Sequence, residues 1–146
     1  MQKSKISKGI SIIEVMCSIF IFEIMILSVI TIQLWNIKIK HCNMRLNSTI
    51  SAMEELKGNL NSICDYSELK VAESYDKVYI SSENLTLEKL MHQKANSLFS
   101  DRLPKKLPYA VLKITGEKIL TIQVEINYKG INGNETIECN TYRGNY

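Results

Sequence analysis

The feature that most constrains this chain of 146 residues is an apolar run near its N-terminus. Most residues from Ile10 to Trp35 are apolar, and the stretch from Val15 to Leu34 holds about 20 residues. In a helix that rises ~1.5 Å per residue, such a stretch spans about 30 Å, the thickness of a bilayer's hydrocarbon core. Trp35 ends the run where an interfacial aromatic residue is expected. The sequence therefore predicts one membrane-spanning helix.

The rest of the chain has the composition of a soluble protein. Over the whole sequence, 45% of residues are hydrophobic and 23% are charged, which excludes a wholly disordered chain and a polytopic membrane protein. The length supports one ordinary domain and excludes a large multidomain enzyme. The net charge is only +3 and the longest basic run is Lys105-Lys106, so we expect no nucleic acid among the partners.

The residues around the start of the apolar run do not form an ordinary secretory signal. Residues 1–9 carry lysines and no acid, as the basic start of such a signal does. The run itself is too long, lacks an A-x-A cleavage site and contains two carboxylates, Glu14 and Glu23. Basic residues also follow the run, so charge alone does not predict which way the helix crosses the membrane.

The junction between leader and apolar run resembles the type III signal of type IV prepilins and type II secretion pseudopilins. In that family a short basic leader ends in glycine, and a glutamate is the fifth residue after the cut. Within residues 8–15, KGISIIEV, Gly9 matches the last leader residue and Glu14 the fifth mature position, whereas Ile10 stands where the family most often has Phe. The resemblance implies that a membrane-embedded prepilin peptidase cuts after Gly9 and then methylates the amine of Ile10.

The residue types of this motif suit that chemistry. Gly9 has no side chain, so a protease pocket can close around its backbone. A carboxylate in apolar surroundings costs about 2.5–3.5 kcal/mol, so Glu14 favours a cationic partner. The freed amine of Ile10 on a neighbouring subunit is one such partner, and this pairing would set the register of the two helices. The alternative is that Glu14 reaches the membrane interface one turn away.

A second carboxylate in the apolar run is a further candidate assembly residue. Glu23 lies nine residues after Glu14, so a helix places the two on opposite faces. It also lies near the middle of the predicted span, where an ionised carboxylate is most costly. We expect Glu23 to form a second contact face for another subunit, as an initiating complex requires. The alternative is a protonated glutamate with no role.

The helical pattern continues beyond Trp35. Apolar residues recur every three or four positions up to Ile63, and Gly58 is the only helix breaker. The pattern predicts one helix from about Ser11 to about Ser62 whose second half packs on a sheet; a free-standing coiled coil is the alternative. The expected apolar stripe is Leu46, Ile50, Met53, Leu56, Leu60 and Ile63. The residues expected to face outward are Asn47, Ser51, Glu54 and Glu55.

The remaining sequence predicts a small antiparallel sheet. From Tyr109 onward, apolar residues recur at every second position, most clearly over residues 120–128. The predicted strands are 77–80, 111–115, 120–128 and 135–143, with turns at 116–117 and 130–134. We also expect a loop over residues 64–74 and, from an N-cap at Thr86, a helix to about Phe99 with one apolar face: Leu87, Leu90, Met91, Leu98 and Phe99.

These elements predict an α+β fold, in which a long N-terminal helix packs on an antiparallel β-meander. That arrangement resembles the pilin-type roll, and the strand spacing looks like that of minor pilins and minor pseudopilins. The resemblance divides the chain into a leader (1–9), a transmembrane and assembly helix (10–35) and an extracytoplasmic head (36–146).

The cysteines and histidines indicate no metal site. None of the four cysteines forms a CxxC pair, so a zinc ribbon or thioredoxin-type site has no support. Cys64 and Cys139 both fall in the head, and we predict a disulfide between them; the alternative is that all four cysteines are reduced. His92 has no second ligand at a suitable spacing, so we expect neither a metal nor a cofactor.

No Gly-rich phosphate loop, HExxH motif or Ser/His/Asp set indicates an enzyme. The resemblance implies a minor pilin-like subunit of a type IV pilus or a related filament. Its partners would be the prepilin peptidase, other pilin or pseudopilin subunits, and lipid of the cytoplasmic membrane. It would cross that membrane once with its N-terminus inside and later join a cell-surface filament. Two alternatives stay open: a minor pseudopilin of a competence or type II secretion system, and an unprocessed, membrane-anchored extracytoplasmic binding protein.

Overall fold

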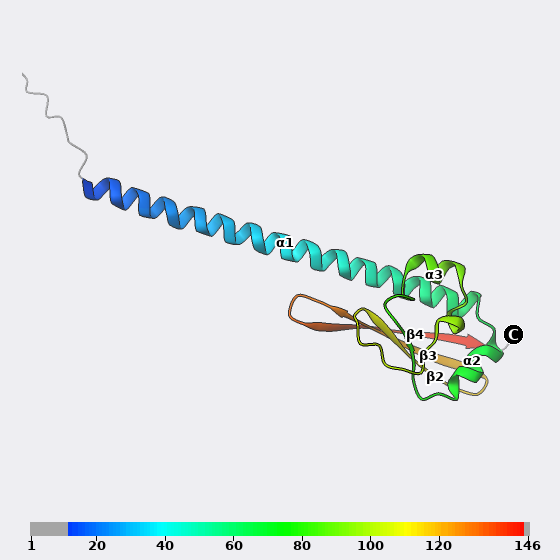
Figure 1. Ribbon diagram of the computed structural model, residues 1–146. Coiled ribbons are helices and arrows are strands. Elements are labelled where there is room, and N and C mark those ends of the chain that lie inside the picture. Colours follow the sequence, from blue (N-terminus) through cyan, green and yellow to red (C-terminus); the bar gives the residue numbers. More distant parts are fainter. Residues whose placement is uncertain (1–11, 145–146) are drawn as a thin grey trace, which may run out of the picture. The chain divides into compact units, whose positions relative to one another are not determined.

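The computed structural model describes residues 12–144, and its longest element is a helix. This helix, α1 (Ile12–Ser62), runs without a break, as the sequence predicted (Figure 1). The chain divides between Ile39 and Lys40 into two units. The first unit contains the first part of α1, and the second is a head that contains the rest of α1 and all later elements.

The head is an α+β fold in which the second part of α1 packs on a four-stranded antiparallel sheet. The strands lie in the sheet in the order β1-β2-β3-β4, which is a meander. The predicted fold class and the four predicted strands are confirmed. The elements after α1 are α2 (Tyr66–Glu73), β1 (Val78–Ile80), α3 (Leu87–His92), the 3-10 helix η1 (Ala95–Leu98), β2 (Tyr109–Thr115), β3 (Ile119–Lys129) and β4 (Asn134–Gly144).

Strand β3 shows why a sheet forms in this part of the chain. Its even-numbered residues from Leu120 to Tyr128 are buried, and the residues between them are at least partly exposed. Because alternate side chains of a strand point to opposite faces, the sheet has one apolar face and one polar face. The register pairs Ile122 with Ile114 of β2 and with Thr141 of β4. The α1 side chains in the same core are Ala52, Met53, Leu56 and Leu60.

The buried side of α1 differs in part from the predicted apolar stripe. Met53, Leu56 and Leu60 are buried and Leu46 is half-buried, but Ile50 and Ile63 are exposed, so the prediction was wrong for these two. Smaller or polar residues, Thr49, Ala52 and Asn59, are buried on this side instead. Of the residues predicted to face outward, Asn47 and Glu54 are exposed, and Ser51 and Glu55 are half-buried.

Asn59 explains this difference. It is only 2% exposed, and its side chain makes hydrogen bonds across the head. Its amide nitrogen donates to the backbone carbonyls of Leu90 (2.5 Å) and Gln93 (2.6 Å), and its oxygen accepts from the backbone N–H of Ala95 (2.9 Å). A buried amide without such partners costs about 1–3 kcal/mol. Because of these bonds, the side of α1 that packs in the head is the side that contains Asn59. It differs from the purely apolar stripe predicted from the sequence.

The helix predicted from Thr86 to Phe99 is shorter than expected. Thr86 is the N-cap of α3 as predicted, but α3 ends at His92, and η1 follows as a separate turn. The side chain of Asn59 binds the backbone groups on both sides of this break and replaces hydrogen bonds that a continuous helix would make. In the predicted apolar face, Leu90 and Leu98 are buried and Phe99 is half-buried, whereas Leu87 and Met91 are exposed.

Helix α2 stands where the sequence predicted a loop, so that prediction was wrong. The backbone N–H of Asp65 donates to the carboxylate of Glu68 (3.1 Å), the pairing typical of a capping box. Leu69 and Ala72 of this helix are buried. Lys94 binds the same helix end through Asp65 (3.2 Å) and Glu68 (3.0 Å). The hydrogen bond from Asp65, and then the contact with Lys94, lower the pKa of Glu68.

The turn between β2 and β3 depends on a glycine. Gly116 has a φ of +128°, and a Cβ there would lie 2.1 Å from the carbonyl oxygen of Ile119, so only glycine fits. Helix α2 contacts this turn from two residues. Lys70 donates to the carbonyl of Gly116 (2.8 Å), and the N–H of Gly116 donates to the carboxylate of Glu73 (3.0 Å). The predicted turn at this point is confirmed.

All four cysteines are free thiols in the structure. Cys64 lies in the core, where burial raises the pKa of its thiol and the sulfur donates to the side-chain oxygen of Asn59 (3.5 Å). The sulfur of Cys139 contacts the carbonyl of Asn140 (3.6 Å). The predicted disulfide between Cys64 and Cys139 is therefore not formed in this structure.

A side-chain hydrogen bond joins β3 and β4 next to their hairpin turn. The phenol of Tyr128 donates to the carboxylate of Glu135 (2.6 Å). This bond, together with burial of the phenol, raises the pKa of Tyr128 to about 12. A raised pKa means that the folded protein holds this proton more tightly than the unfolded chain does. The resulting stabilisation is fully present below about pH 10 and is lost as the pH rises through about 12.

Replacing Asn59 by alanine should destabilise the head. Two carbonyls and one N–H would lose their partner in a buried place, so we expect the free energy of unfolding to fall by about 2–4 kcal/mol. Circular dichroism during thermal unfolding of the full chain in detergent measures the loss. Asn47→Ala, at an exposed position of the same helix, is the matched control. Equal stability of the two variants would contradict the role of Asn59.

Titration with base, followed by tyrosinate absorbance, tests the bond between Tyr128 and Glu135. Tyr128 should ionise in a late step near pH 12, above the ordinary tyrosine value of about 10. This late step should vanish in Tyr128→Phe. It should move to lower pH in Glu135→Gln, since the charged acceptor is gone. A late step that persists in Tyr128→Phe belongs to another tyrosine and would refute the assignment.

Candidate membrane anchor and assembly helix

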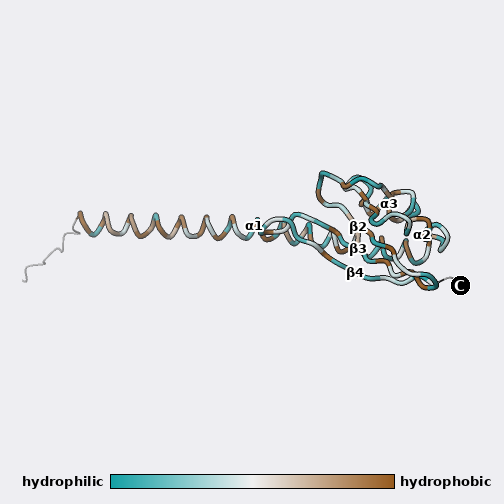
Figure 2. Tube along the Cα trace, turned by 90° about the horizontal axis from the view of Figure 1, so that it is seen from below, coloured by the Kyte–Doolittle hydropathy of each residue, from teal (hydrophilic) through white to brown (hydrophobic). Residues whose placement is uncertain are grey.

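The first part of α1, up to Ile39, exposes its apolar surface on every side. All of its described side chains are exposed, among them Phe20 (63%) and Leu27 (64%). Figure 2 shows the hydrophobic colouring along this part of the helix. Burying one such side chain stabilises a protein by about 1.5–3 kcal/mol. A helix that is apolar all round therefore needs lipid or other helices around it.

The hydroxyl groups of this segment bond within the helix. Ser18 donates to the carbonyl of Glu14 (2.7 Å), Ser28 to that of Ile24 (2.8 Å), and Thr31 to that of Leu27 (2.8 Å). Each bond joins residues one turn apart, and it satisfies a hydroxyl group that would otherwise be costly in an apolar environment. These polar residues are therefore compatible with a lipid or helix-packed environment.

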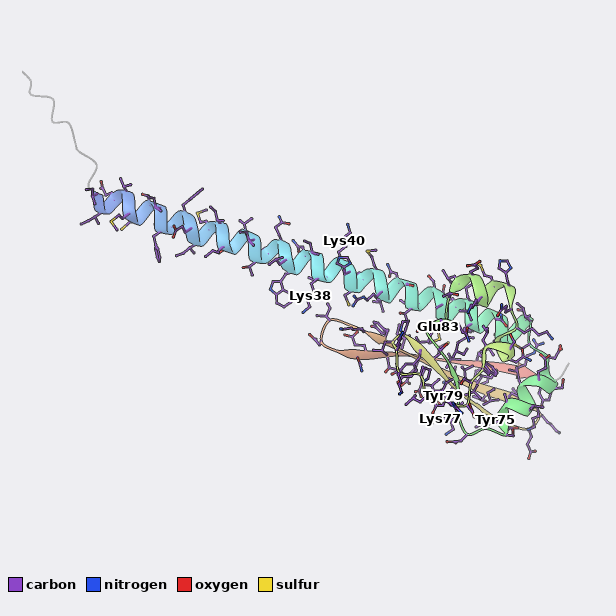
Figure 3. The ribbon with its side chains drawn as sticks, viewed as in Figure 1. Lys38, Lys40, Tyr75, Lys77, Tyr79 and Glu83 are labelled. Atoms are coloured by element: carbon purple, nitrogen blue, oxygen red, sulfur yellow. The ribbon has the colours of Figure 1, made fainter. Side chains whose placement is uncertain are left out.

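Among the described residues, α1 is the one helix that is long and apolar enough to cross a membrane. Near the end of its apolar run, the ammonium group of Lys38 lies 5.1 Å from the centre of the Trp35 ring, a cation–π contact. Figure 3 labels Lys38 at this part of the helix. Tryptophan and lysine together are typical of the water-facing boundary of a membrane helix.

The two carboxylates predicted to direct assembly lie on this segment. Glu14 is in the first turn of α1, where the positive end of the helix dipole stabilises an acid. Glu23 lies about two and a half turns later, so the continuous helix places it on the opposite face. Both residues are exposed, as an intermolecular contact requires. The predicted cleavage and methylation residues, Gly9 and Ile10, lie outside the described residues.

Sequence reasoning missed one group of residues that the fold brings together. His41 and Arg45 of α1 line a pocket with Lys129 of β3, which is far away in the sequence. No linear motif marks a pocket whose walls come from separate segments. The available signal was the row of basic residues that follows the apolar run.

No model of a known protein family, no curated protein and no solved structure matches this chain.

We expect Trp35, the only tryptophan, to lie at the bilayer interface after reconstitution. Lipids brominated near the start of the acyl chain should quench its fluorescence more than lipids brominated near the chain end. A matched control carries Trp35→Phe and Ile24→Trp, which moves the ring to the middle of the span, and should show the reverse order. Quenching of Trp35 by a water-soluble quencher alone would contradict the membrane anchor.

Proposed function

We propose that this chain is a minor pilin-like subunit of a type IV pilus or a related bacterial filament, cut after Gly9 by a prepilin peptidase. The observation that carries the proposal is that α1 has two roles, as a membrane-length apolar helix and as part of the core of the head. One helix offers an uncovered apolar surface of membrane length and also supplies core residues to a small β-meander head. Lipid can cover that surface before assembly, and neighbouring helices can cover it afterwards.

Cleavage would add a positive charge to an assembly helix that already carries two carboxylates. A cut after Gly9 creates an amine at Ile10, four residues before Glu14. Opposite charges attract far more strongly in apolar surroundings than in water. The amine of one subunit and Glu14 of its neighbour would therefore pair inside the packed helices and set their stagger.

The position of Glu23 supports a minor subunit rather than the main subunit of a filament. It lies on the face opposite Glu14 and is surrounded by apolar side chains such as Phe20 and Leu27 along the helix. A carboxylate at that depth is costly, so it favours a contact with a polar or cationic group of another subunit. A subunit with two different contact faces suits the start of a filament, where unlike subunits meet.

Two other functions lead to different observations. A minor pseudopilin of a competence or type II secretion system would be cut in the same way and would differ in the subunits that co-purify with it. A membrane-anchored binding protein that is never processed would keep Met1. Processing separates the last function from the first two, and the co-purifying subunits separate the first two from each other.

Gly9→Leu should block processing, because a branched side chain obstructs a pocket that closes around bare backbone. When the variant is expressed with a prepilin peptidase, the full-length precursor should accumulate in the membrane and migrate more slowly on a gel. Ser4→Leu places the same side chain elsewhere in the leader and should be cut normally. Normal cleavage of Gly9→Leu would remove the main support for the proposed signal.

Glu14→Ala should leave cleavage intact, because the peptidase recognises Gly9. It should lower the amount of subunit in filaments by roughly tenfold, because the neighbouring subunit binds the carboxylate of Glu14. Immunoblots of sheared filaments and membranes measure both effects. Glu23→Leu, on the other face, is the matched comparison. It should retain cleavage and instead weaken co-purification with other minor subunits. Filaments that hold Glu14→Ala at the wild-type level would show that the pairing is dispensable.

A further inference from the structure

A pocket of about 510 Å³ lies between the second part of α1, the segment before β2 and the end of β3. Three basic side chains line it: His41 and Arg45 from α1, and Lys129 from β3. All three are exposed, so they are open to a ligand. Among the described residues that line this pocket, none is an acid. The pocket therefore attracts anions.

The remaining wall of the pocket is largely apolar. It is formed by Met44, Leu107, Pro108 and the ring of Tyr128. Glu135 contacts this wall: its carboxylate accepts the hydrogen bond from the Tyr128 phenol (2.6 Å) and keeps its negative charge, but Arg45 and Lys129 of the pocket together outweigh it. A basic rim beside an apolar wall suits a ligand that is itself amphiphilic, with an anionic group next to carbon chains.

The position of the pocket in the chain indicates that membrane lipid is the amphiphile nearest to it. His41 and Arg45 follow the apolar run that ends at Trp35 by no more than ten residues. Along the continuous helix α1, at a rise of ~1.5 Å per residue, Arg45 follows Trp35 by about 15 Å. Lys38 and Lys40, labelled on α1 in Figure 3, add positive charge just before the pocket.

We propose that this pocket binds the headgroup of an anionic phospholipid in the membrane that α1 is long enough to cross. The planar guanidinium of Arg45 can donate two parallel hydrogen bonds to the phosphate, and the ammonium of Lys129 can neutralise it from the other wall. The glycerol and the first methylene groups would lie against Met44 and Leu107. A zwitterionic headgroup fits less well, because its own cation would meet the cations of the rim.

Neither Gly9 nor Glu14 lines this pocket, so lipid binding there does not depend on processing or filament assembly. An acidic segment of a neighbouring subunit is the other occupant with matching charge. The lipid is favoured because the wall beside the charges is apolar and because His41 and Arg45 follow the predicted membrane span by no more than ten residues.

The test uses the full chain in neutral detergent micelles and the ring signals of its two histidines in NMR spectra. His41 lines the pocket and reports binding, whereas His92 does not line it and is an internal reference. Short-chain phosphatidylglycerol, phosphatidylcholine of the same chain length and inorganic phosphate are titrated separately. Phosphatidylglycerol should shift His41 and leave His92 unchanged, with a Kd about tenfold or more below those of the other two probes.

Variants separate the pocket from overall charge. Arg45→Gln with Lys129→Gln should raise the Kd for phosphatidylglycerol about tenfold or more. Lys113→Gln with Lys118→Gln removes the same charge outside the pocket and should leave the Kd unchanged.

Three results would overturn the proposal. Equal Kd values for phosphatidylglycerol and phosphatidylcholine would show that the pocket does not distinguish headgroups by their charge. Equal binding of inorganic phosphate would show that the apolar wall does not contribute. Self-association of the protein that shifts His41 while phosphatidylglycerol does not would assign the pocket to a neighbouring subunit.

Discussion

The first part of α1 exposes apolar side chains on every side, so lipid or other helices must surround it. The rest of the structure depends on this requirement. Its side chains are exposed in the structure, and its hydroxyl groups already bond to the helix backbone. Lipid and neighbouring helices both meet the requirement, because each offers apolar contact without competing for backbone hydrogen bonds. In the proposed function, a subunit that moves from a membrane into a filament would exchange contacts with lipid for contacts with neighbouring helices. The carboxylates of Glu14 and Glu23 lie on opposite faces of this largely apolar surface.

The head depends on the same helix. Leu56 and Leu60 of α1 are fully buried against the sheet, so the head needs the second part of α1 for its core. Asn59 then ties the last turn of α3 and the segment that follows it to α1 through three backbone groups. If the proposed function holds, a subunit drawn into a filament by its helix would carry with it a head whose core is built on that helix.

The sequence predicted those elements whose cause is local and missed those whose cause is distant. The alternation of β3 follows from burial of one sheet face, and the length of α1 follows from an unbroken apolar period. The capping pair of Asp65 and Glu68 was a readable local signal for α2 that was overlooked. The break after α3 could not be predicted, because it comes from Asn59, which lies on another helix. The pocket of Arg45 and Lys129 was hidden for the same reason, since only the fold brings the two together.

The most direct measurement is the intact mass of the wild-type chain recovered from cell membranes that contain a prepilin peptidase. The account predicts a protein that lacks residues 1–9 and carries one methyl group on the amine of Ile10. The same chain from cells without the peptidase should keep Met1. A chain that keeps residues 1–9 in the presence of an active peptidase would contradict the proposed function and leave a membrane-anchored head.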